Sequence, residues 1–292
     1  MNIQKSFEET ERGVLYVVPT PIGNLEDITY RALKTLESVH FIAAEDTRNT
    51  KKLLNHFDIT TSLISYHEHN KTAREEQLLK KLEKGESIAI VSDAGMPAIS
   101  DPGLEIVQAA MKREFKVVVL PGANAALCAL IGSGLPTNEF YFYGFLPKKK
   151  KEKEAELTRL KSLQATLLFY ESPYRLKDTL KVMKEVFGTR NAAIAREMTK
   201  RFEEYVRGSI DEVIGWSDEN ELRGEFCIVI EGREEEEIKA HAEWWRVLSI
   251  AEHVKHYMEK ENHTSKEAIK RVALDRNVPK REIYQVYHVD KK

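Results

Sequence analysis

The 292-residue sequence predicts an α/β protein, with two α/β domains followed by a small helical domain. Three observations support this fold class. Strand-like apolar runs alternate with amphipathic helical patterns up to residue 135, as in βαβ units. A turn cluster, GSGLPTN at 132–138, separates this first set of strands and helices from a second set of strand-like runs. The acidic run at 234–237 precedes a helix-rich tail, so we expect domains at 1–135, 136–235 and 240–292.

The first domain is expected to hold a largely parallel sheet, because helix-length segments separate its strands. In the segment REEQLLKKLEKG, Leu78, Leu79 and Leu82 recur at helical spacing and Gly85 marks the end of the helix. The expected strands are 14–18, 41–44, 87–92 and 116–120.

The second domain is expected to hold a mixed sheet. Its predicted strands are 140–145, 166–170, 191–196, 203–208 and 225–232. Only the short helical segment IDEVIGWS separates the last two, which is too little for an ordinary parallel crossover. The tail then predicts helices at 244–259, 265–276 and 280–288, with Ser265 and Pro279 as residues that favour the start of the last two.

The composition is that of an ordinary soluble globular protein, with 42% hydrophobic and 32% charged residues. No apolar run approaches the ~20 residues that span a bilayer, and the polar N-terminus MNIQKSFEETERG does not read as a signal peptide. Cys128 and Cys227 lie in apolar stretches, so we expect buried thiols in a reducing cytoplasm. The histidines form no zinc pattern, and we expect a cytoplasmic, metal-independent protein.

Three loops after predicted strands have an unusual composition: PTPIGN (19–24), SDAGMPAISDPG (92–103) and PGANAA (121–126). Ligands of α/β folds bind at such strand ends. Neither a dinucleotide fingerprint nor a P-loop is present. The prolines remove amide donors, and Asp93 and Asp101 add negative charge, so these loops suit a neutral or positive ligand such as S-adenosylmethionine. Each loop alone is typical of a turn, whereas the three together favour a binding site.

The motifs VPTPIGNLEDIT, AAEDTRNTKKLL, VSDAGMPAISDPG, PGANAA, FYGFLP and LLFYESPYRL occur in this order over residues 12–232. This chain thereby resembles the tetrapyrrole methylase superfamily, and within it the branch that 2′-O-methylates a cytidine of 16S ribosomal RNA. The resemblance implies two α/β domains with S-adenosylmethionine bent in the cleft between them. It also implies a homodimer, and the helical tail resembles the small C-terminal domain of this branch.

The resemblance also implies a set of cofactor-binding residues. The first loop, PTPIGN, is expected to form a rigid wall of the cleft, with Gly23 allowing close approach of the cofactor or substrate. The full set is Pro19, Gly23, Ser92, Asp93, Ala94, Gly95, Pro97, Pro121, Gly122, Asn124, Tyr170, Glu171, Gly224 and Glu225. Two positions depart from the family pattern. Met96 replaces the usual threonine, and Ala123-Asn124 replaces Pro-Ser. Asn124 keeps a short polar side chain, so we expect the pocket to survive.

Basic residues near the predicted cleft suggest a phosphate backbone as partner, here 16S rRNA or the small ribosomal subunit. The residues Lys148, Lys149, Lys150 and Lys151 stand at the start of a predicted helix, where they oppose the helix dipole. A run of charged residues more commonly indicates a solvent-exposed face of a helix than a binding surface. Arg48 and Arg175 add positive charge, and Tyr174 could either stack on an unstacked base or pack the second domain.

Removing the proton of a ribose hydroxyl calls for a base or for local positive charge. The candidates are Glu45, Asp46, His67, His69 and Glu197. Glu45 and Asp46 directly follow a predicted strand and are the better placed pair, although an acid there could instead hold Arg48. His67 and His69 have no evident third metal ligand and read as polar loop residues.

Two other functions remain open on the same fold. One is a tetrapyrrole-precursor C-methyltransferase, against which the lysine run and the helical tail argue. The other is a non-catalytic RNA-binding ribosome assembly factor, against which the three intact cofactor-type loops argue.

Overall fold

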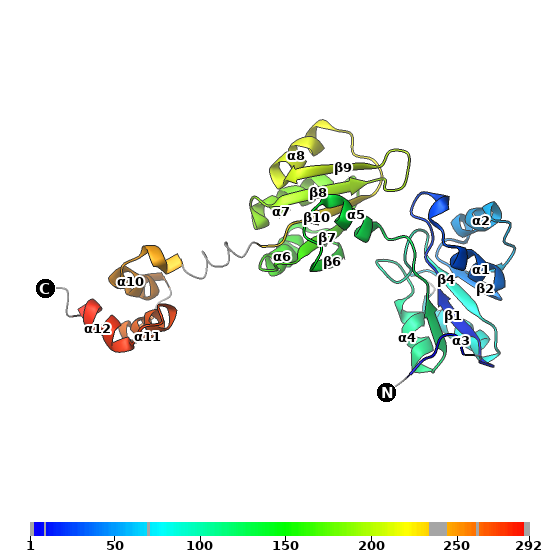
Figure 1. The fold of residues 1–292 in the computed structure, drawn as a ribbon, viewed down its shortest axis with the longest axis horizontal. Coiled ribbons are helices and arrows are strands. Elements are labelled where there is room, and N and C mark those ends of the chain that lie inside the picture. The colour runs from blue at the N-terminus through cyan, green and yellow to red at the C-terminus, as the bar shows by residue number, and fades with distance from the viewer. Residues whose placement is uncertain (1–2, 9, 69–70, 234–243, 261–262, 289–292) are drawn as a thin grey trace. The chain divides into compact units, whose positions relative to one another are not determined.

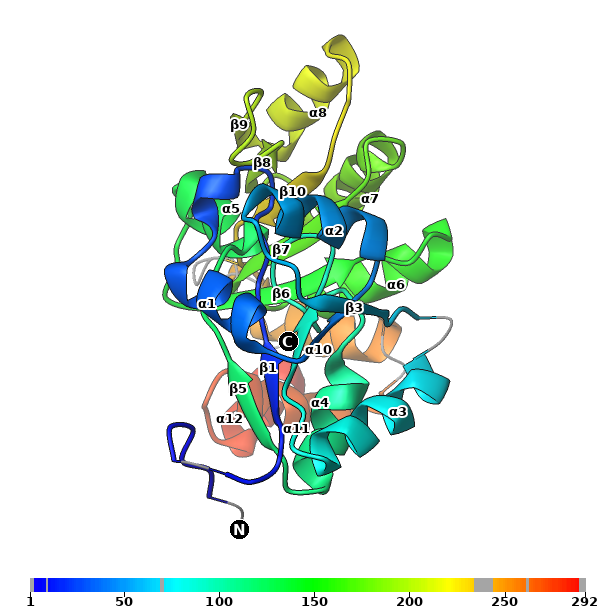
Figure 2. The same cartoon turned by 90° about the vertical axis from the view of Figure 1, so that its right-hand side faces the viewer.

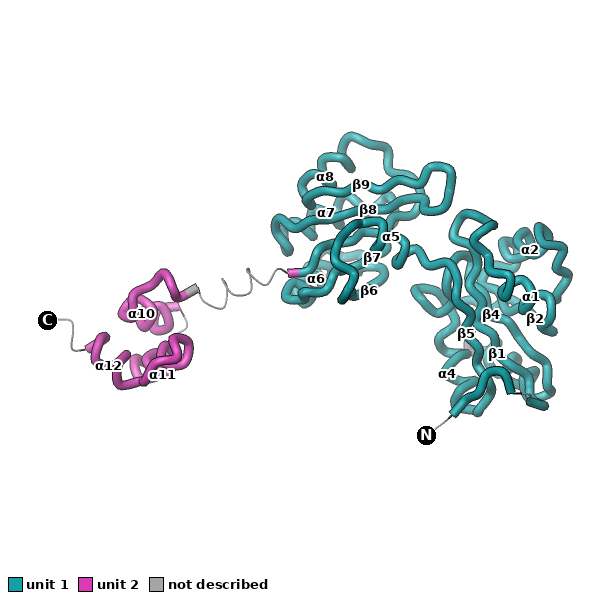
Figure 3. Tube along the Cα trace, in the orientation of Figure 1, with its two compact units in different colours: residues 1–232 teal, residues 233–292 magenta. Residues whose placement is uncertain are grey.

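A computed structural model describes residues 3–8, 10–68, 71–233, 244–260 and 263–288 of the chain. These residues belong to two compact units, 1–232 and 233–292 (Figure 3). The first unit contains two five-stranded sheets, and the second is helical (Figure 1). The predicted α/β class with C-terminal helices is confirmed, while the predicted domain boundaries stay a prediction.

The first sheet is parallel throughout, in the order β3-β2-β4-β1-β5. Its strands are β1 (Val14–Val17), β2 (Phe41–Ala44), β3 (Ser62–Ser65), β4 (Ile88–Val91) and β5 (Lys116–Val119). The central strand β4 is wholly buried and reads as a continuous apolar run. The sequence reasoning missed β3, because this edge strand is exposed to half-buried and has serine at both ends.

Helices cover both faces of the first sheet. The helices α1 (Tyr30–Ser38) and α2 (Thr47–His56) pack on one face through residues such as Leu36 and Leu54. The helices α3 (Lys71–Glu83) and α4 (Leu104–Lys112) lie side by side on the other (Figure 2) and bury Leu78, Leu82 and Ile106. A short 3₁₀ helix, η1 (Leu25–Asp27), follows the first loop.

The second sheet is mixed, in the order β6-β7-β10-β8-β9. Its strands are β6 (Phe140–Phe145), β7 (Thr166–Glu171), β8 (Asn191–Arg196), β9 (Glu204–Ser209) and β10 (Phe226–Ile230). Only the β6–β7 pair is parallel within this sheet, and β10 lies antiparallel between β7 and β8. The helices α6 (Lys150–Leu160), α7 (Leu176–Phe187) and α8 (Ile210–Glu219) cover one face.

Helix α5 (Ala125–Ser133) covers the opposite face of the second sheet. Its Ala126, Ala129 and Leu130 pack with Leu168 and Cys227. The chain therefore passes from the first sheet to the second before α5, at the PGANAA loop. Turn composition marks where a chain bends, whereas packing decides which sheet a helix joins.

The C-terminal unit contains η2 (Trp244–Val247), α10 (Ile250–Lys260), α11 (Ser265–Asp275) and α12 (Lys280–His288). Val254, Val272 and Ile283 are buried in its core. The cap of α11 is Thr264, one residue before the predicted Ser265. The Thr264 hydroxyl accepts from the Glu267 amide and the Glu267 carboxylate accepts from the Thr264 amide, which forms a capping box.

The two cysteines differ in their surroundings. Cys227 is buried in β10, as expected, but Cys128 is exposed on α5, so the expectation of two buried thiols is wrong. Helix α5 is apolar almost all round, and only the face toward the sheet is covered. In the described residues, no helix has the length and apolar character needed to cross a membrane.

Candidate functional site

The three proline-rich loops meet at one place. Thr20 and Gly95 exchange two backbone hydrogen bonds of 2.9 and 3.0 Å, which joins the first loop to the second. The third loop lies against the first, since a Cβ built on Gly122 would come within 2.6 Å of the Pro19 Cβ. The three loops therefore lie together at one place, as we expected.

A cavity of ≈ 340 Å³ opens beside these loops, within the size range of small-molecule sites. Its wall combines loops of the first sheet with strand ends of the second. The lining residues are Ile22, Asp93, Ala94, Gly95, Met96, Ile99, Ser100, Asp101, Asn124, Ala125, Phe145, Tyr170, Glu171, Ser172, Pro173, Glu197, Met198, Lys200, Glu225, Phe226 and Cys227. The wall thus has an apolar part and several carboxylates.

About half of the predicted cofactor residues line this cavity. They are Asp93, Ala94, Gly95, Asn124, Tyr170, Glu171 and Glu225, together with the predicted catalytic residue Glu197. Asn124 also caps α5, since its side chain accepts from the Leu127 amide at 3.1 Å. The Tyr170 hydroxyl accepts from the Ala126 amide at 3.2 Å and so connects the second sheet to the start of α5.

The other predicted residues are not among the lining residues: Pro19, Gly23, Ser92, Pro97, Pro121, Gly122 and Gly224. Ser92 is buried and donates to the Ala94 carbonyl at 3.3 Å, so it holds the second loop. Gly23 lies against the Lys200 side chain, and Gly224 lies against Glu197. The close approach at Gly23 is thus made by protein, whereas we expected a cofactor or substrate there.

Sequence reasoning missed several lining residues, including Ile22, Met198 and Lys200. Met198 and Lys200 belong to the segment after β8, where no motif drew attention to them. Asp101 belongs to the quoted second loop, and its charge was noted, but nothing local indicated that it faces the same cavity as Asp93.

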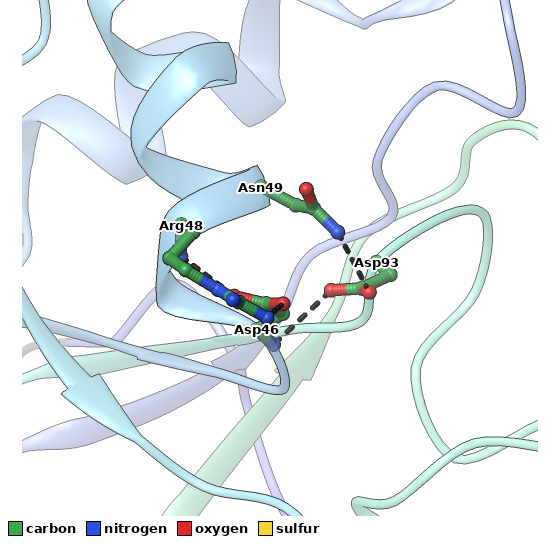
Figure 4. A network of polar contacts seen from close by, with 4 residues as sticks. All are labelled: Asp46, Arg48, Asn49 and Asp93. Carbon is green, nitrogen blue, oxygen red and sulfur yellow. Dashed lines mark hydrogen bonds and ion pairs between the residues drawn. The ribbon is translucent and has the colours of Figure 1, made fainter.

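Asp46 serves mainly as a helix cap (Figure 4). Its Oδ1 accepts from the Arg48 amide at 2.8 Å, and its Oδ2 accepts from the Arg48 guanidinium at 2.6 Å. These bonds lower the pKa of Asp46 to about 2. Asp93 accepts from the Asp46 amide and from the Asn49 side chain, each at 3.1 Å. The first turn of α2 therefore holds Asp93 in place.

Negative charge is concentrated around Asp101. Partial burial, followed by the charges of Glu45, Asp93 and Glu225, raises the pKa of Asp101 to about 7. Glu45 is not among the residues that line the cavity, and burial is the main reason that its pKa is raised. This part of the site favours a cation or a proton.

A buried polar chain supports the opposite wall. Lys153 is 4% exposed and donates to the Thr179 hydroxyl at 2.7 Å, and Thr179 donates to Glu171 at 2.7 Å. Glu171 also accepts from the Ser172 amide at 2.8 Å. Arg175, predicted to contact RNA, donates to the Leu146 and Pro147 carbonyls at 2.7 and 3.1 Å, which ties two loops of the second sheet together.

The predicted RNA-binding residues are only partly available. Lys149 pairs with Glu152 at 2.9 Å, and Lys150 pairs with Glu185 at 3.1 Å. Lys148 and Lys151 are exposed and have no ion pair to a described residue. Tyr174 is 94% exposed and directly follows the cavity residue Pro173. Arg48 is exposed but is paired with Asp46.

Among residues 3–8, 10–68, 71–233, 244–260 and 263–288, no cluster of three or more His, Cys, Asp or Glu could hold a metal ion. His67 is half-buried, and His69 lies outside the described residues.

Comparisons with known proteins agree on one family. A family model described as tetrapyrrole (corrin/porphyrin) methylases matches residues 14–214. Ribosomal RNA small subunit methyltransferase I of Bacillus subtilis is 56% identical over 287 residues, covering 98% of each chain. The protein of the same name from Halalkalibacterium halodurans is 54% identical over 289 residues, covering 99% of each.

A solved structure shows the same fold at lower identity. It is uroporphyrin-III C-methyltransferase from Thermus thermophilus, in complex with S-adenosyl homocysteine. It matches with a TM-score of 0.52 and 18% identity, covering 74% of this chain and 97% of that one.

Proposed function

Because the chain belongs to the tetrapyrrole methylase family, in the branch of ribosomal RNA small subunit methyltransferase I, we propose that it methylates the 2′-oxygen of a cytidine ribose in 16S rRNA. S-adenosylmethionine is the cofactor. The substrate is proposed to be the rRNA within the small ribosomal subunit, in its decoding region. The names of the relatives support an rRNA substrate, and the family resemblance of the sequence supports the ribose oxygen.

The acidic cavity is the observation that carries this proposal. S-adenosylmethionine has a sulfonium and an ammonium group and no phosphate, so it needs carboxylates more than amide donors. Asp93, Asp101 and Glu225 supply negative charge in the wall. The only lysine among the described lining residues, Lys200, is paired with Glu197 at 2.9 Å. The residues present therefore fit the cofactor.

The cofactor would lie against residues from both sheets. The second loop, with Asp93, Ala94 and Gly95, and the start of α5 at Asn124 would hold it on one side. Ile22, Met198 and Phe226 provide apolar surface that excludes water. When bound, S-adenosylmethionine supplies a methyl group on a positively charged sulfur. The protein's part is to align the substrate oxygen with that methyl group in a dry cavity.

Tyr174, Lys148 and Lys151 form the proposed RNA contact, which we call the RNA surface. Tyr174 stands next to the cavity wall and exposes its ring, as a stacking platform requires. The two lysines follow Leu146 and Pro147, whose carbonyls accept from Arg175, the residue directly before α7. The same bonds therefore connect the lysine segment to the Tyr174 loop.

We also propose a cytoplasmic homodimer. The exposed side of α5, where Ile131 is 75% and Leu127 is 45% exposed, offers apolar surface for a second copy. The molecular mass in solution, measured by light scattering, tests the dimer.

The central test is a labelling assay. The protein is incubated with methyl-labelled S-adenosylmethionine and either undermodified small ribosomal subunits or uroporphyrinogen. We expect label on a cytidine 2′-oxygen of 16S rRNA, located by nuclease digestion and mass spectrometry. Label on the macrocycle would instead identify a tetrapyrrole-precursor methylase. RNA binding with no label on either substrate would identify an assembly factor.

Replacing the lysines of the RNA surface should weaken rRNA binding more than replacing the neighbouring lysines that are paired with glutamates. The double variant Lys148→Gln/Lys151→Gln should weaken rRNA binding and reduce the slope of log K against log salt by about 1 to 2. The matched variant Lys149→Gln/Lys150→Gln removes the same charge, but from lysines already paired with glutamates, so its effect should be smaller. Equal slopes for both variants would contradict the proposed surface.

A further inference from the structure

We propose that the C-terminal unit binds the phosphate backbone of the rRNA substrate through a basic surface on α11 and α12. This surface consists of Lys266 and Lys270 on α11 and of Lys280 and Arg281 on α12, and we call it the C-terminal basic surface. The inference rests on the proposed function, because it takes rRNA as the partner. It adds a second RNA contact to the RNA surface of the unit 1–232.

The helices of the C-terminal unit are basic. Residues 244–288 hold nine Lys and Arg against six Asp and Glu, a balance of +3. The whole chain, by contrast, has a net charge of −2. Positive charge is therefore concentrated in these helices, which is the electrostatic pattern of a part that meets a polyanion.

The four side chains of the C-terminal basic surface are available to a partner. All four are exposed, and none has a hydrogen bond or ion pair to any residue that the structure describes. Other cations of the unit are engaged within it. Arg271 lies 3.8 Å from Asp275, and Arg276 donates to the Trp245 and Leu248 carbonyls. The unit thus keeps some of its cations for its own fold and leaves these four to solvent.

Helical spacing puts the basic residues on the outer side of the unit. Lys266 and Lys270 are four residues apart on α11, so they are neighbours along one side of that helix. The core of the unit takes other residues of the two helices, namely Ala268, Ile269, Val272, Ala273 and Ile283. The side that carries the lysines is therefore not needed for packing within the unit.

A tight turn brings the two parts of the surface together. Helices α11 and α12 pack against each other (Figure 1). The Val278 amide bonds the Ala273 carbonyl at 3.0 Å, and Asn277 has a left-handed φ of 50°. As a result Lys270 and Lys280, which are ten residues apart in the chain, line the same hollow of ≈ 470 Å³.

The chemistry of this hollow suits a sugar–phosphate backbone. Lys270 and Lys280 supply charge for phosphate, and Asn277 adds an amide side chain. Leu274, which is 66% exposed, gives the hollow an apolar part that can contact a sugar. Tyr284 follows Lys280 by four residues on α12 and is 54% exposed, so its ring is a neighbour of the lysine and can stack on a base.

Helix stability does not explain the basic residues of α12. Lys280 and Arg281 occupy its first two positions, where positive charge opposes the helix dipole. Helix α11 shows the favourable alternative, since Glu267 stands in its first turn and completes a capping box. A bound phosphate would offset the unfavourable charge at the start of α12, because anions are stabilised at helix N-termini.

The expected role is in substrate binding and not in methyl transfer itself. None of the four residues lines the cavity of the unit 1–232. An rRNA held by the C-terminal basic surface stays tethered to the chain that carries this cavity, which raises its effective concentration there. Loss of the surface should therefore raise KM and leave kcat unchanged.

The double variant Lys270→Gln/Lys280→Gln of the full chain tests the proposal. Its binding to a 16S rRNA transcript should weaken roughly tenfold, and the slope of log K against log salt should fall by about 1 to 2. Methylation of undermodified small subunits should show the raised KM. The matched variant Lys255→Gln/Lys260→Gln removes the same charge from exposed positions on α10 that do not line the hollow, so its effects should be smaller.

Three results would overturn the proposal. Equal losses in the two double variants would reduce the effect to net charge. Weaker binding to small subunits with unchanged binding to the bare transcript would make a ribosomal protein the partner. An unchanged KM in Lys270→Gln/Lys280→Gln would leave the surface a solvated face. Thermal unfolding and S-adenosylhomocysteine affinity, measured for each variant, should match wild type and show that the fold is intact.

The proposed function is tested separately by the wild-type protein. Label on rRNA from the wild type, with equal KM values for the wild type and both double variants, would overturn this inference alone. Wild-type label on uroporphyrinogen and none on rRNA would instead overturn the proposed function, on which the inference rests.

Discussion

Lys151 and Lys153 stand two residues apart in the same charged run, yet their surroundings differ completely. Lys151 is exposed, whereas Lys153 is 4% exposed and donates to Thr179. Burial lowers the pKa of Lys153, and the nearby Glu171 offsets part of this effect. At the scale of single residues, one lysine is thus available to a partner molecule and the other supports the cavity wall.

Replacing Thr179 should show how much its hydrogen bonds to Lys153 and Glu171 stabilise the protein. Thr179→Val keeps the side-chain shape but leaves Lys153 and Glu171 without their shared partner, so the free energy of unfolding should fall by about 1–3 kcal/mol. Thr158→Val is the control, because the Thr158 hydroxyl bonds only the exposed Glu154 carbonyl in its own helix, and it should cost less than about 0.5 kcal/mol. If denaturant unfolding gave a similar loss of unfolding free energy for both variants, the buried Lys153–Thr179–Glu171 hydrogen bonds would not be a specific source of stability.

At the scale of elements, the site is built by loops that pack on one another. The first loop pairs with the second through Thr20 and Gly95, and the third contacts the first through Gly122 and Pro19. The prolines offer no amide donors, and they make the first loop a stiff support for the others. The side chains that reach the cavity from these loops are therefore held by backbone contacts.

Two glycine substitutions should have opposite effects. In Gly122→Ala the new Cβ would lie 2.6 Å from the Pro19 Cβ, so the loops must separate, at a cost of about 1–3 kcal/mol and with weaker S-adenosylhomocysteine binding. Gly215→Ala, within α8, meets nothing within 4 Å and should stabilise the protein by about 0.5–1 kcal/mol. Urea unfolding and calorimetry measure both effects. Unchanged binding in Gly122→Ala would argue against the loop contact as a support of the cavity.

At the scale of the whole molecule, the C-terminal unit has its own core and its own response to pH. His253 is fully buried, stacks on Trp245 with ring centroids 5.6 Å apart, and accepts from Arg276 at 3.2 Å. Burial first, and then the charge of Arg276, lower its pKa from 6.5 to about 4. The folded unit therefore favours neutral His253.

This unit should lose stability in acid. The stabilisation from His253 is fully present above pH 6.5 and is lost as pH falls toward about 4, because the unfolded state binds the proton more readily. NMR signals of residues 250–288 in the full chain should report unfolding over this range. His253→Gln should flatten the pH dependence, whereas His288→Asn, at an exposed position, should leave it unchanged. If the stability of the wild-type unit depended on pH as little as that of His253→Gln, neutral His253 would not be the source of the acid sensitivity.

Much of the molecule could be predicted before any coordinates. The alternation of strands and helices, the parallel first sheet and the three loops at strand ends all follow from local patterns of apolar, proline and glycine residues. The quoted motifs led to the right family, and the loop composition indicated a cationic cofactor without phosphate. These features depend on residues that are near one another in the chain.

The tertiary structure decided the remaining questions. In the structure, α5 packs on the second sheet and Lys153 is buried. Asp46 caps a helix, and Asp101 lines the cavity. The cap at Asp46 uses the neighbouring Arg48, but the other outcomes depend on a partner distant in sequence, such as Thr179 for Lys153, or on the lack of one. The sequence by itself therefore determined which elements form and which chemistry they can hold. Long-range packing alone decided which side chain of each kind faces the cavity, because burial and pairing are set by neighbours that local sequence does not specify.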